Sequence, residues 1–487
     1  MRLNRRTMKS HQKTPASTNS GRNCSARRGG SLARPKRRSG LNRRRFLERL
    51  AVGAAAAAVP MVIPARVLGG AGRTPPNEKI RLAGIGVGGM GAANLQALAP
   101  YCDVVALCDV DERRAAETFA RYPAARRFKD FRRMFEEMSD KFDAVMVATP
   151  DHTHAVASMM ALRHRKHVYC EKPLAHSVHE VRALMRAAAE AGVVTQLGNQ
   201  GHSFDSIRDC VEWLQAGVIG RVHTIYCGCE AVNSGLDRLA EVKQGQPVPS
   251  TLDWDLWLGP VPWRPYHSAY LPGAWRGWTA FGSGTIGDWV CHVVDPVFWA
   301  LDLGAPRSVV AKVKDWDPRT QGEAYPKGDV VTFEFPARGG RGPVTLHWYS
   351  GTERIPRPEG FDPEEPDVRT GAIVVGDRGM MVYGSHGASH VHLVPDKLMK
   401  EFQRPPRRLP RGLEHHRDWI EAIRQGRKAG SDFTSYGGPL TELAMLGIVA
   451  IKMPGVKLEW DAAQMQFTNV SEANQYLRTP YREGWTL

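Results

Sequence analysis

Short apolar runs alternate with amphipathic segments between residues 80 and 197. Five runs have the length and β-branched content of buried strands, and the segments between them carry apolar residues at helical spacing. The runs cover Ile80–Ile85, 104–108, 143–149, 166–170 and 193–197. Strict alternation of strand and helix predicts a parallel sheet with helices on both faces. In such an α/β domain, ligands bind beyond the carboxyl ends of the strands.

The pattern changes after residue 204. A helix is predicted at 207–216, and then several strands follow without helices between them, at 222–228, 309–314, 329–335, 344–349 and 372–375. Such a run of strands predicts a mostly antiparallel, open sheet. Closing helices are predicted at 415–425 and 440–451. The prediction is therefore an α/β domain at 76–200, followed by a larger α+β domain at 201–487.

The charge of the chain is concentrated at its N-terminus. The formal net charge is +16, which by itself would suggest a nucleic-acid-binding protein. Fifteen of the 66 Lys and Arg residues lie in residues 1–45, which contain no Asp or Glu. The remaining 51 basic residues nearly match the 50 acidic ones. The predicted folded part is therefore almost neutral, and nucleic acid is not expected as its partner.

The basic segment has the features of an export signal within residues 1–75. Arg43 and Arg44 precede Phe46 and Leu47, an alanine-rich apolar run covers 50–63, and small residues follow. This arrangement resembles a twin-arginine signal, which exports folded proteins. It predicts a periplasmic protein whose partners include the twin-arginine export machinery. A basic disordered arm joined to an alanine-rich helix is the alternative.

Glycines at the end of the first predicted strand have the spacing of a dinucleotide-binding loop. Gly86, Gly88 and Gly91 form G-x-G-x-x-G between the strand and a predicted helix at 92–99. The next strand ends at Asp109, where an acid that binds the ribose hydroxyls is expected. These features predict a Rossmann domain, and a carboxylate at 109 favours NAD over NADP. A glycine-rich loop that binds nothing is the alternative.

Further motifs at the strand ends resemble a known family. AGIGVGGMG, ALCDVD, VATPDHTHA and HVYCEKPLA are similar to the glucose-fructose oxidoreductase / inositol dehydrogenase / rhizopine-catabolism (Gfo/Idh/MocA) family. The resemblance runs from about Ile80 to the C-terminus. It implies an oligomer, a dimer or tetramer, formed through the open sheet of the second domain. The cofactor site predicted from the glycine loop and these motifs contains Gly86, Gly88, Gly89, Met90, Gly91, Asp109, Thr149, Pro150, His154, Glu171 and Lys172.

The resemblance also implies a catalytic group of three residues. Lys172 of the EKP motif would lie near the nicotinamide and the reacting hydroxyl, where an ammonium stabilises developing negative charge. Asp288 and His292 match the D-x-x-x-H pair of the family and lie at i and i+4 of a predicted helix. The carboxylate is expected to orient the imidazole and raise its basicity, with His292 as acid/base. Asp295 would extend the same helix face. A surface lysine and a helix-surface ion pair are the alternatives.

Tryptophans are concentrated around this helix. Seven of the 13 lie between residues 254 and 299, and aromatic faces suit the C–H faces of sugars. We expect one or two at the site and the others in packing. The predicted substrate residues are Asn199, Tyr266, Trp275, Arg276 and Asp295. No metal is expected, because the eight cysteines are scattered and resemble core thiols.

These observations predict an NAD-dependent oxidoreductase that acts on a secondary hydroxyl of a sugar, glycoside or polyol. An NAD-dependent glycoside hydrolase, using transient oxidation and elimination, would need the same residues. Export favours chemistry in which the cofactor is regenerated on the enzyme. A binding protein on a retained fold is a third reading. The chain has Asn199-Gln200-Gly201-His202 where many family members have Asn-Arg, so substrate identity is not carried over.

Overall fold

The computed structural model describes residues 79–487. The predicted export signal lies outside this range. No helix between residues 79 and 487 is long and apolar enough to cross a membrane. The described residues contain two sheets, with six strands in the first and nine in the second.

The first sheet is parallel and has the strand order β3-β2-β1-β4-β5-β6. Its strands are β1 (Ile80–Ile85), β2 (Cys102–Cys108), β3 (Arg126–Phe128), β4 (Ala144–Val147), β5 (His167–Cys170) and β6 (Thr195–Leu197). The order reverses between β1 and β4, which is where a Rossmann fold binds its dinucleotide. The predicted parallel sheet and Rossmann domain are confirmed.

Helices cover both faces of this sheet. They are α2 (Met90–Leu98), α3 (Glu112–Arg121), α4 (Phe131–Met138), α5 (Asp151–Arg163) and α6 (Val178–Ala191). Side chains cap three of these helices at their N-termini. Asp111 accepts from the backbone of Arg113 at the start of α3, and Asp130 and Ser177 do the same for α4 and α6.

The second sheet has the order β13-β12-β11-β7-β10-β9-β8-β14-β15. Its strands are β7 (Val222–Cys229), β8 (Ser308–Val313), β9 (Gly328–Phe335), β10 (Val344–Gly351), β11 (Gly371–Gly376), β12 (Gly379–Gly384), β13 (His392–Val394), β14 (Leu458–Asp461) and β15 (Gln466–Phe467). Only β7 and β10 pair in parallel among these neighbours, so the predicted antiparallel character is confirmed.

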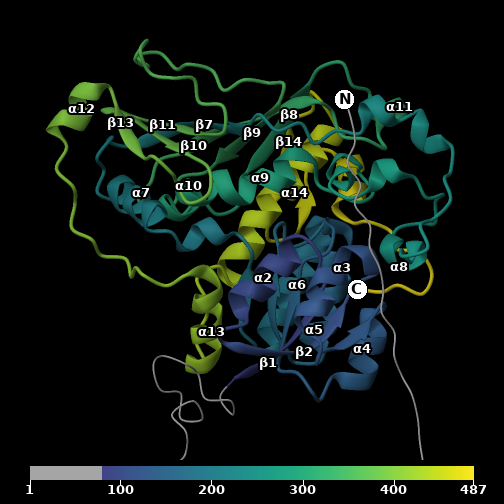
Figure 1. Ribbon diagram of the computed structural model, residues 1–487. Coiled ribbons are helices and arrows are strands. Elements are labelled where there is room, and N and C mark those ends of the chain that lie inside the picture. The colour runs from purple at the N-terminus through teal and green to yellow at the C-terminus, as the bar shows by residue number, and fades with distance from the viewer. Residues whose placement is uncertain (1–78) are drawn as a thin grey trace, which may run out of the picture. The chain divides into compact units, whose positions relative to one another are not determined.

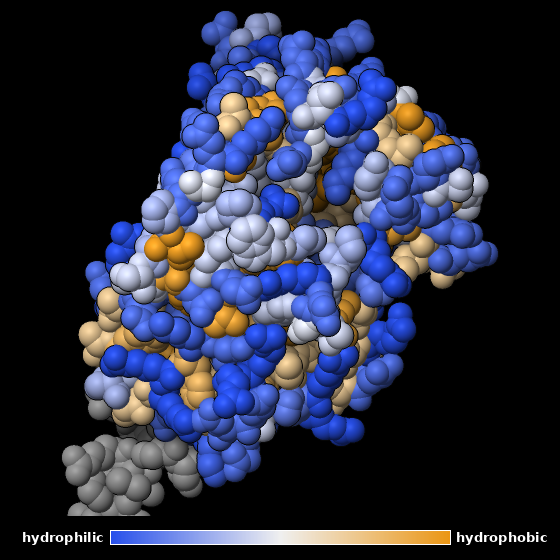
Figure 2. Space-filling model, turned by 90° about the vertical axis from the view of Figure 1, so that its right-hand side faces the viewer, coloured by the Kyte–Doolittle hydropathy of each residue, from blue (hydrophilic) through white to orange (hydrophobic). Residues whose placement is uncertain are grey.

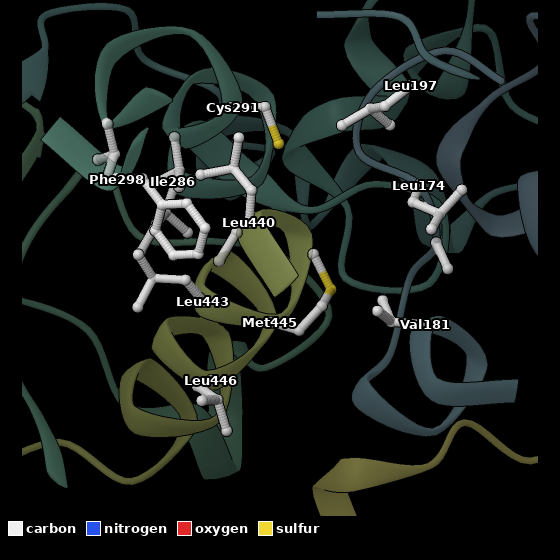
Figure 3. Close-up of a cluster of buried hydrophobic side chains, with 14 of the residues drawn as sticks. Leu174, Val181, Leu197, Ile286, Cys291, Phe298, Leu440, Leu443, Met445 and Leu446 are labelled. Atoms are coloured by element: carbon white, nitrogen blue, oxygen red, sulfur yellow. The ribbon is translucent and has the colours of Figure 1, made fainter. Parts of the chain in front are cut away.

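Helices between the two sheets form the common core. They are α7 (Asp205–Gln215), α9 (Gly284–Val293), α10 (Asp295–Ala300) and α14 (Gly438–Lys452), which lie on one side of the second sheet (Figure 1). Leu440, Leu443 and Met445 of α14 project among side chains of α9, α10 and the first domain (Figure 3). One apolar core therefore joins both sheets and fixes α9 against the Rossmann domain.

Two C-terminal segments pack on the first domain, although they follow the predicted boundary at residue 200. Helix α13 (His415–Gln425) inserts Trp419 and Ile420 into the core beside β1 and α2. The tail places Trp485 6.0 Å from Phe131, between ring centroids, and the hydroxyl of Tyr481 donates to Glu180. The tail therefore docks on the Rossmann domain of its own chain.

The tryptophan-rich insertion is a separate aromatic cluster. It contains the short helix α8 (Trp254–Leu258), and the ring centroids of Trp254 and Trp257 are 4.8 Å apart. Tyr266 packs against Trp254 in this cluster. The remaining helices, α11 (Pro318–Gln321) and α12 (Asp396–Glu401), are short and peripheral (Figure 1).

Candidate active site

The loop after β1 requires glycine for two different reasons. Gly86 has φ = 74°, and a Cβ there would lie 2.7 Å from the carbonyl oxygen of Ala148. A Cβ on Gly91 would lie 1.9 Å from the carbonyl oxygen of Gly86. Helix α2 then begins without an acidic residue in its first turn and without a side-chain cap. The tight turn and the close packing of helix on strand that a G-x-G-x-x-G loop requires are therefore both present.

A cleft of about 340 Å³ opens above the carboxyl ends of β1, β2 and β4. Eleven of the predicted residues line it: Gly86, Gly88, Met90, Asp109, Thr149, Pro150, His154, Glu171, Lys172, Trp275 and Arg276. Trp257 also lines the cleft, so two tryptophans lie in its wall, in agreement with the one or two that were expected at the site. The molecular face that carries α8 is mostly hydrophilic but hollowed, with hydrophobic surface inside the hollow (Figure 2).

Asp109 is engaged by the glycine loop itself. Its Oδ2 accepts from the backbone N–H groups of Val87 at 2.8 Å and Gly88 at 3.2 Å, and its Oδ1 accepts from that of Asp111 at 3.0 Å. Burial raises the pKa of this carboxyl, although the three N–H groups act against the shift. Asp109 therefore holds the loop in shape, and its predicted contact with a ribose stays a prediction.

Lys172 and Asp288 meet across the two domains. The Lys172 Nζ donates to the Asp288 Oδ1 at 2.5 Å and to the Asp288 carbonyl at 2.9 Å. Arg276 Nε also donates to Oδ1, at 3.0 Å, and Asn233 Nδ2 donates to Oδ2 at 3.1 Å. Burial acts to raise the pKa of Asp288, but the charges of Lys172 and Arg276 outweigh it and hold the pKa well below its usual range. Asp288 is thus a fixed anion that positions the ammonium.

The predicted role of Asp288 as the partner of His292 is wrong. Both residues lie on α9, but no hydrogen bond joins them within residues 79–487. The expected rise in basicity is also wrong, because burial, and then the charge of Lys172, lower the pKa of His292 well below its usual value. Its Nδ1 is buried without a hydrogen-bond partner in the described structure. His292 is therefore a neutral imidazole with a buried, unpartnered Nδ1, and neither His292 nor Asp288 lines the cleft.

Three predicted substrate residues lie outside the cleft. Asp295 begins α10 and does not extend the face of α9. Its Oδ2 accepts from Asn199 Nδ2 at 3.1 Å, and its Oδ1 faces His202 Nδ1 at 2.9 Å, in a fully buried network. Tyr266 is buried in the aromatic cluster. The structure thus places Asn199, Asp295 and Tyr266 away from the cleft lining, and their predicted substrate contacts stay predictions. The Oδ1 of Asn199 is buried without a partner in the described structure.

The side chains of the EKP and TPDHTH motifs mostly brace the cleft wall. Glu171 Oε1 accepts from Asn94 Nδ2 and Gln200 Nε2, both at 2.9 Å. His154 has Nδ1 2.7 Å from the carbonyl oxygen of Pro173 and Nε2 2.8 Å from that of Thr149. His154 thus bridges two loops as a buried histidine, and its predicted contact with the cofactor stays a prediction. The Oγ1 of Thr149, in contrast, is buried without a partner in the described structure.

Sequence reasoning missed two neighbours of this site. Asn233 reaches Asp288 from the segment after β7 and belongs to no motif. His386 is exposed, and its ring stacks on His292 with 4.0 Å between centroids. It lies at φ = 49° beside Gly387. The sequence GSHG at 384–387 indicates a tight loop, but it does not indicate that this loop packs against His292. No group of His, Cys, Asp or Glu side chains within residues 79–487 is arranged to hold a metal ion.

Comparison with known proteins identifies the two domains. Residues 80–199 match the model of an oxidoreductase family with an NAD-binding Rossmann fold, and residues 234–324 match the C-terminal alpha/beta domain of the same family. Both segments, which together make up less than half of the chain, match the Gfo/Idh/MocA oxidoreductase family. The family resemblance drawn from the motifs is confirmed. The motif residues 86–91, 109, 149–154 and 171–172 all lie within the first matched segment.

Two curated relatives match the first domain. An inositol 2-dehydrogenase of Rubrobacter xylanophilus is 39% identical over 119 residues, which are 24% of this chain and 33% of the relative. A 2,7-anhydro-N-acetylneuraminate hydratase of Escherichia coli is 35% identical over 80 residues, 16% of this chain and 22% of the relative. The chain thus spans about a third or less of the length of these relatives.

Solved structures share the fold over most of the described chain. An inositol dehydrogenase homolog from Azotobacter vinelandii, crystallised with NAD+, has a TM-score of 0.53 and 16% sequence identity. The match covers 80% of this chain and 99% of that one. At this identity the likeness concerns the fold of the Gfo/Idh/MocA chain and not its substrate.

The residues present fit a nicotinamide dinucleotide. Gly86 and Gly88 line the cleft without side chains, and the first turn of α2 contains no acidic residue, which favours a pyrophosphate. The unpartnered Oγ1 of Thr149 and the ammonium of Lys172 lie at the same strand ends. Gly86, Gly88, Asp109 and Thr149 are the residues that would hold the cofactor.

Proposed function

We propose that this Gfo/Idh/MocA protein is an NAD-dependent oxidoreductase that acts on a secondary hydroxyl of a sugar, glycoside or polyol. The contact between Lys172 and Asp288 carries the proposal, because it places a fixed ammonium from the EKP loop beside the cleft that contains the glycine loop. When bound, the nicotinamide would accept a hydride from the carbinol carbon. The similarity to the Rubrobacter inositol 2-dehydrogenase supports a polyol or sugar substrate.

Each group of the chain has a defined task in this proposal. The Lys172 ammonium donates a hydrogen bond to the reacting oxygen and stabilises its negative charge. Asp288, held by Arg276 and Asn233, keeps that ammonium in position. The neutral His292, one helical turn further along α9, is assigned the uptake of the hydroxyl proton, although its Nδ1 is buried and it does not line the cleft. The product is a carbonyl compound.

Trp275 is proposed as the substrate platform. Its ring lies 4.2 Å below the guanidinium of Arg276, and both line the cleft. Replacing it with leucine is expected to raise KM about tenfold and to change kcat less than about threefold, since a lost aromatic contact affects binding more than chemistry. The matched control is Trp263→Leu, which alters a tryptophan that is 67% exposed and outside the cleft lining. An unchanged KM in Trp275→Leu would rule out the platform.

A glycoside hydrolase with transient oxidation is the second candidate. The hydratase named among the relatives supports it, because hydration of a sugar-derived substrate is not a net oxidation. Incubation with sugars and with aryl glycosides separates the two candidates. Net reduction of the cofactor without release of the aryl group supports the dehydrogenase. Release of the aryl group without net reduction supports the hydrolase.

Location and assembly complete the proposal. Arg43 and Arg44 support export by the twin-arginine machinery, and their replacement by lysine should retain the protein in the cytoplasm. We also propose a homo-oligomer, a dimer or tetramer, through the face of the second sheet that α7, α9 and α14 do not cover (Figure 1). Sedimentation of the purified protein tests this assembly, and a monomer at all concentrations would contradict it.

A further inference from the structure

A second cavity lies apart from the candidate active site. It has a volume of about 340 Å³ and shares no lining residue with the cleft that contains Lys172. Its walls come from the start of α6, the end of α14 and the C-terminal segment around residues 475–480. Two basic side chains, Lys452 and Arg478, line it, together with several hydroxyl groups and no carboxylate. The cavity is therefore positively charged.

Lys452 has no charged partner in the described structure. It is the last residue of α14, and its Nζ lies 5.3 Å from the ring centroid of Tyr476. No hydrogen bond or ion pair of its ammonium is found within residues 79–487. Burial alone lowers the pKa of Lys452 to about 8. A partly buried ammonium without a counterion is costly, and a bound anion would remove that cost.

The neighbouring carboxylate does not supply the missing charge. Glu180, in the first turn of α6, is fully engaged elsewhere: its Oε1 accepts from the hydroxyl of Tyr481 at 2.5 Å, and its Oε2 accepts from the backbone N–H of His176 at 2.8 Å. Arg478 is exposed at the cavity and forms no ion pair within the described residues. Both cations are thus available to a ligand.

We propose that this cavity binds a small oxyanion, a phosphate or carboxylate group, between the ammonium of Lys452 and the guanidinium of Arg478. The hydroxyls of Ser177 and Thr479, also in the lining, supply further donors. This binding site is independent of the proposed oxidoreductase activity.

The cavity wall is connected to the segment before the catalytic helix. The side chain of His176, whose pKa is lowered to about 3 by burial, donates from Nε2 to the carbonyl oxygen of Gly282 at 2.7 Å. Gly282 lies two residues before α9, which carries Asp288. A bound anion would therefore contact the connection between the EKP loop and α9 without touching Lys172 or Asp288.

Calorimetric titration of the whole protein with inorganic phosphate and with malonate, at constant ionic strength set by chloride, tests the proposal. Because the glycine loop also offers N–H groups to an anion, the readout is the difference between the wild type and Lys452→Met. The substitution is expected to raise the dissociation constant of the more tightly bound anion about tenfold, because a charge-assisted hydrogen bond is lost. Lys312→Met, an exposed lysine on β8, is the matched control and should change nothing.

Affinity should also fall between pH 7 and 9. The groups that face Lys452 are His176, Tyr325, Tyr476 and Arg478. His176 is neutral throughout this range, and burial raises the pKa of Tyr325 far above it. Lys452 loses its proton as the pH rises through about 8, so the anion loses its main partner.

The outcomes separate clearly. Tighter binding of phosphate or of malonate identifies the class of oxyanion. The Lys452→Met variant removes a costly charge, so it should fold and be at least as heat-stable as the wild type without anion. Equal affinities in wild type and Lys452→Met, or no binding of either anion, would overturn the proposal.

Discussion

Replacing Lys172 with methionine is expected to lower kcat about 10³-fold while the protein stays folded. The substitution removes the ammonium that would stabilise negative charge on the reacting oxygen, and such a donor contributes two to three orders of magnitude. The fold should survive because Arg276 and Asn233 still bond to the Asp288 carboxylate. The measurement is the rate of nicotinamide reduction at saturating substrate, with near-UV circular dichroism as the check on folding.

Two further variants sharpen this prediction. Lys166 lies just before β5 and outside the cleft lining. Lys166→Met makes the same chemical change there and should alter kcat less than about twofold. Lys172→Arg keeps the positive charge, but a guanidinium does not release a proton. Partial activity of this variant would indicate that Lys172 stabilises charge. Complete loss of activity would indicate that Lys172 also transfers a proton. A Lys172→Met enzyme with kcat within threefold of wild type would contradict the proposed site.

Replacing His292 with glutamine is expected to lower kcat about 10²-fold, because general base catalysis has this magnitude. The pKa of His292 lies well below its usual value, so the neutral, proton-accepting form persists below pH 6.5. The wild type should therefore show no loss of kcat from this group between pH 7.5 and 6. A variant with more than a third of the wild-type kcat would exclude His292 as the base.

His292→Gln is also expected to change how the free energy of unfolding depends on pH. The folded-state pKa of His292 is below its unfolded value of about 6.5. Neutral His292 therefore stabilises the fold above pH 6.5, and this contribution is lost as the pH falls below 6.5. Denaturant titrations from pH 7 to 4.5 should give a steeper loss of unfolding free energy for the wild type than for His292→Gln. His223→Gln, at an exposed position, should follow the wild type.

The elements with strong local signals were predicted well from the sequence. Apolar runs of the right length gave the parallel strands, and Asp111, Asp130 and Ser177 cap their helices because an N-cap depends only on residues two or three positions away. Strands β12 to β15 were missed. Strand β3 was missed as well. Strands β3, β13, β14 and β15 have only two to four residues, too few for a recognisable alternation, and β12 begins and ends with glycine. Only the pairing of β14 with β8 joins segments that are far apart in the sequence.

The sequence predicted several residues of the site but not the contacts between them. Motifs identified Lys172 and Asp288, which are 116 residues apart in sequence. Helical spacing placed Asp288 and His292 on one face, but a lysine from the other domain competes for the carboxylate and outweighs the neighbour on the same helix. Tyr266 and Trp275 both lie in the tryptophan-rich segment. Both belong to the buried aromatic cluster, and only the folded insertion decides that Trp275 also lines the cleft.

Identification of the bound nucleotide tests the central claim most directly. The purified protein is denatured and the released nucleotide is analysed. The native protein, loaded with added NAD where none is retained, is then mixed with a panel of polyols and sugars. The account predicts NAD(H) as the nucleotide and reduction of the nicotinamide by at least one polyol or sugar, with the reduction lost in Lys172→Met. A protein that releases no nucleotide and does not bind added NAD would contradict it.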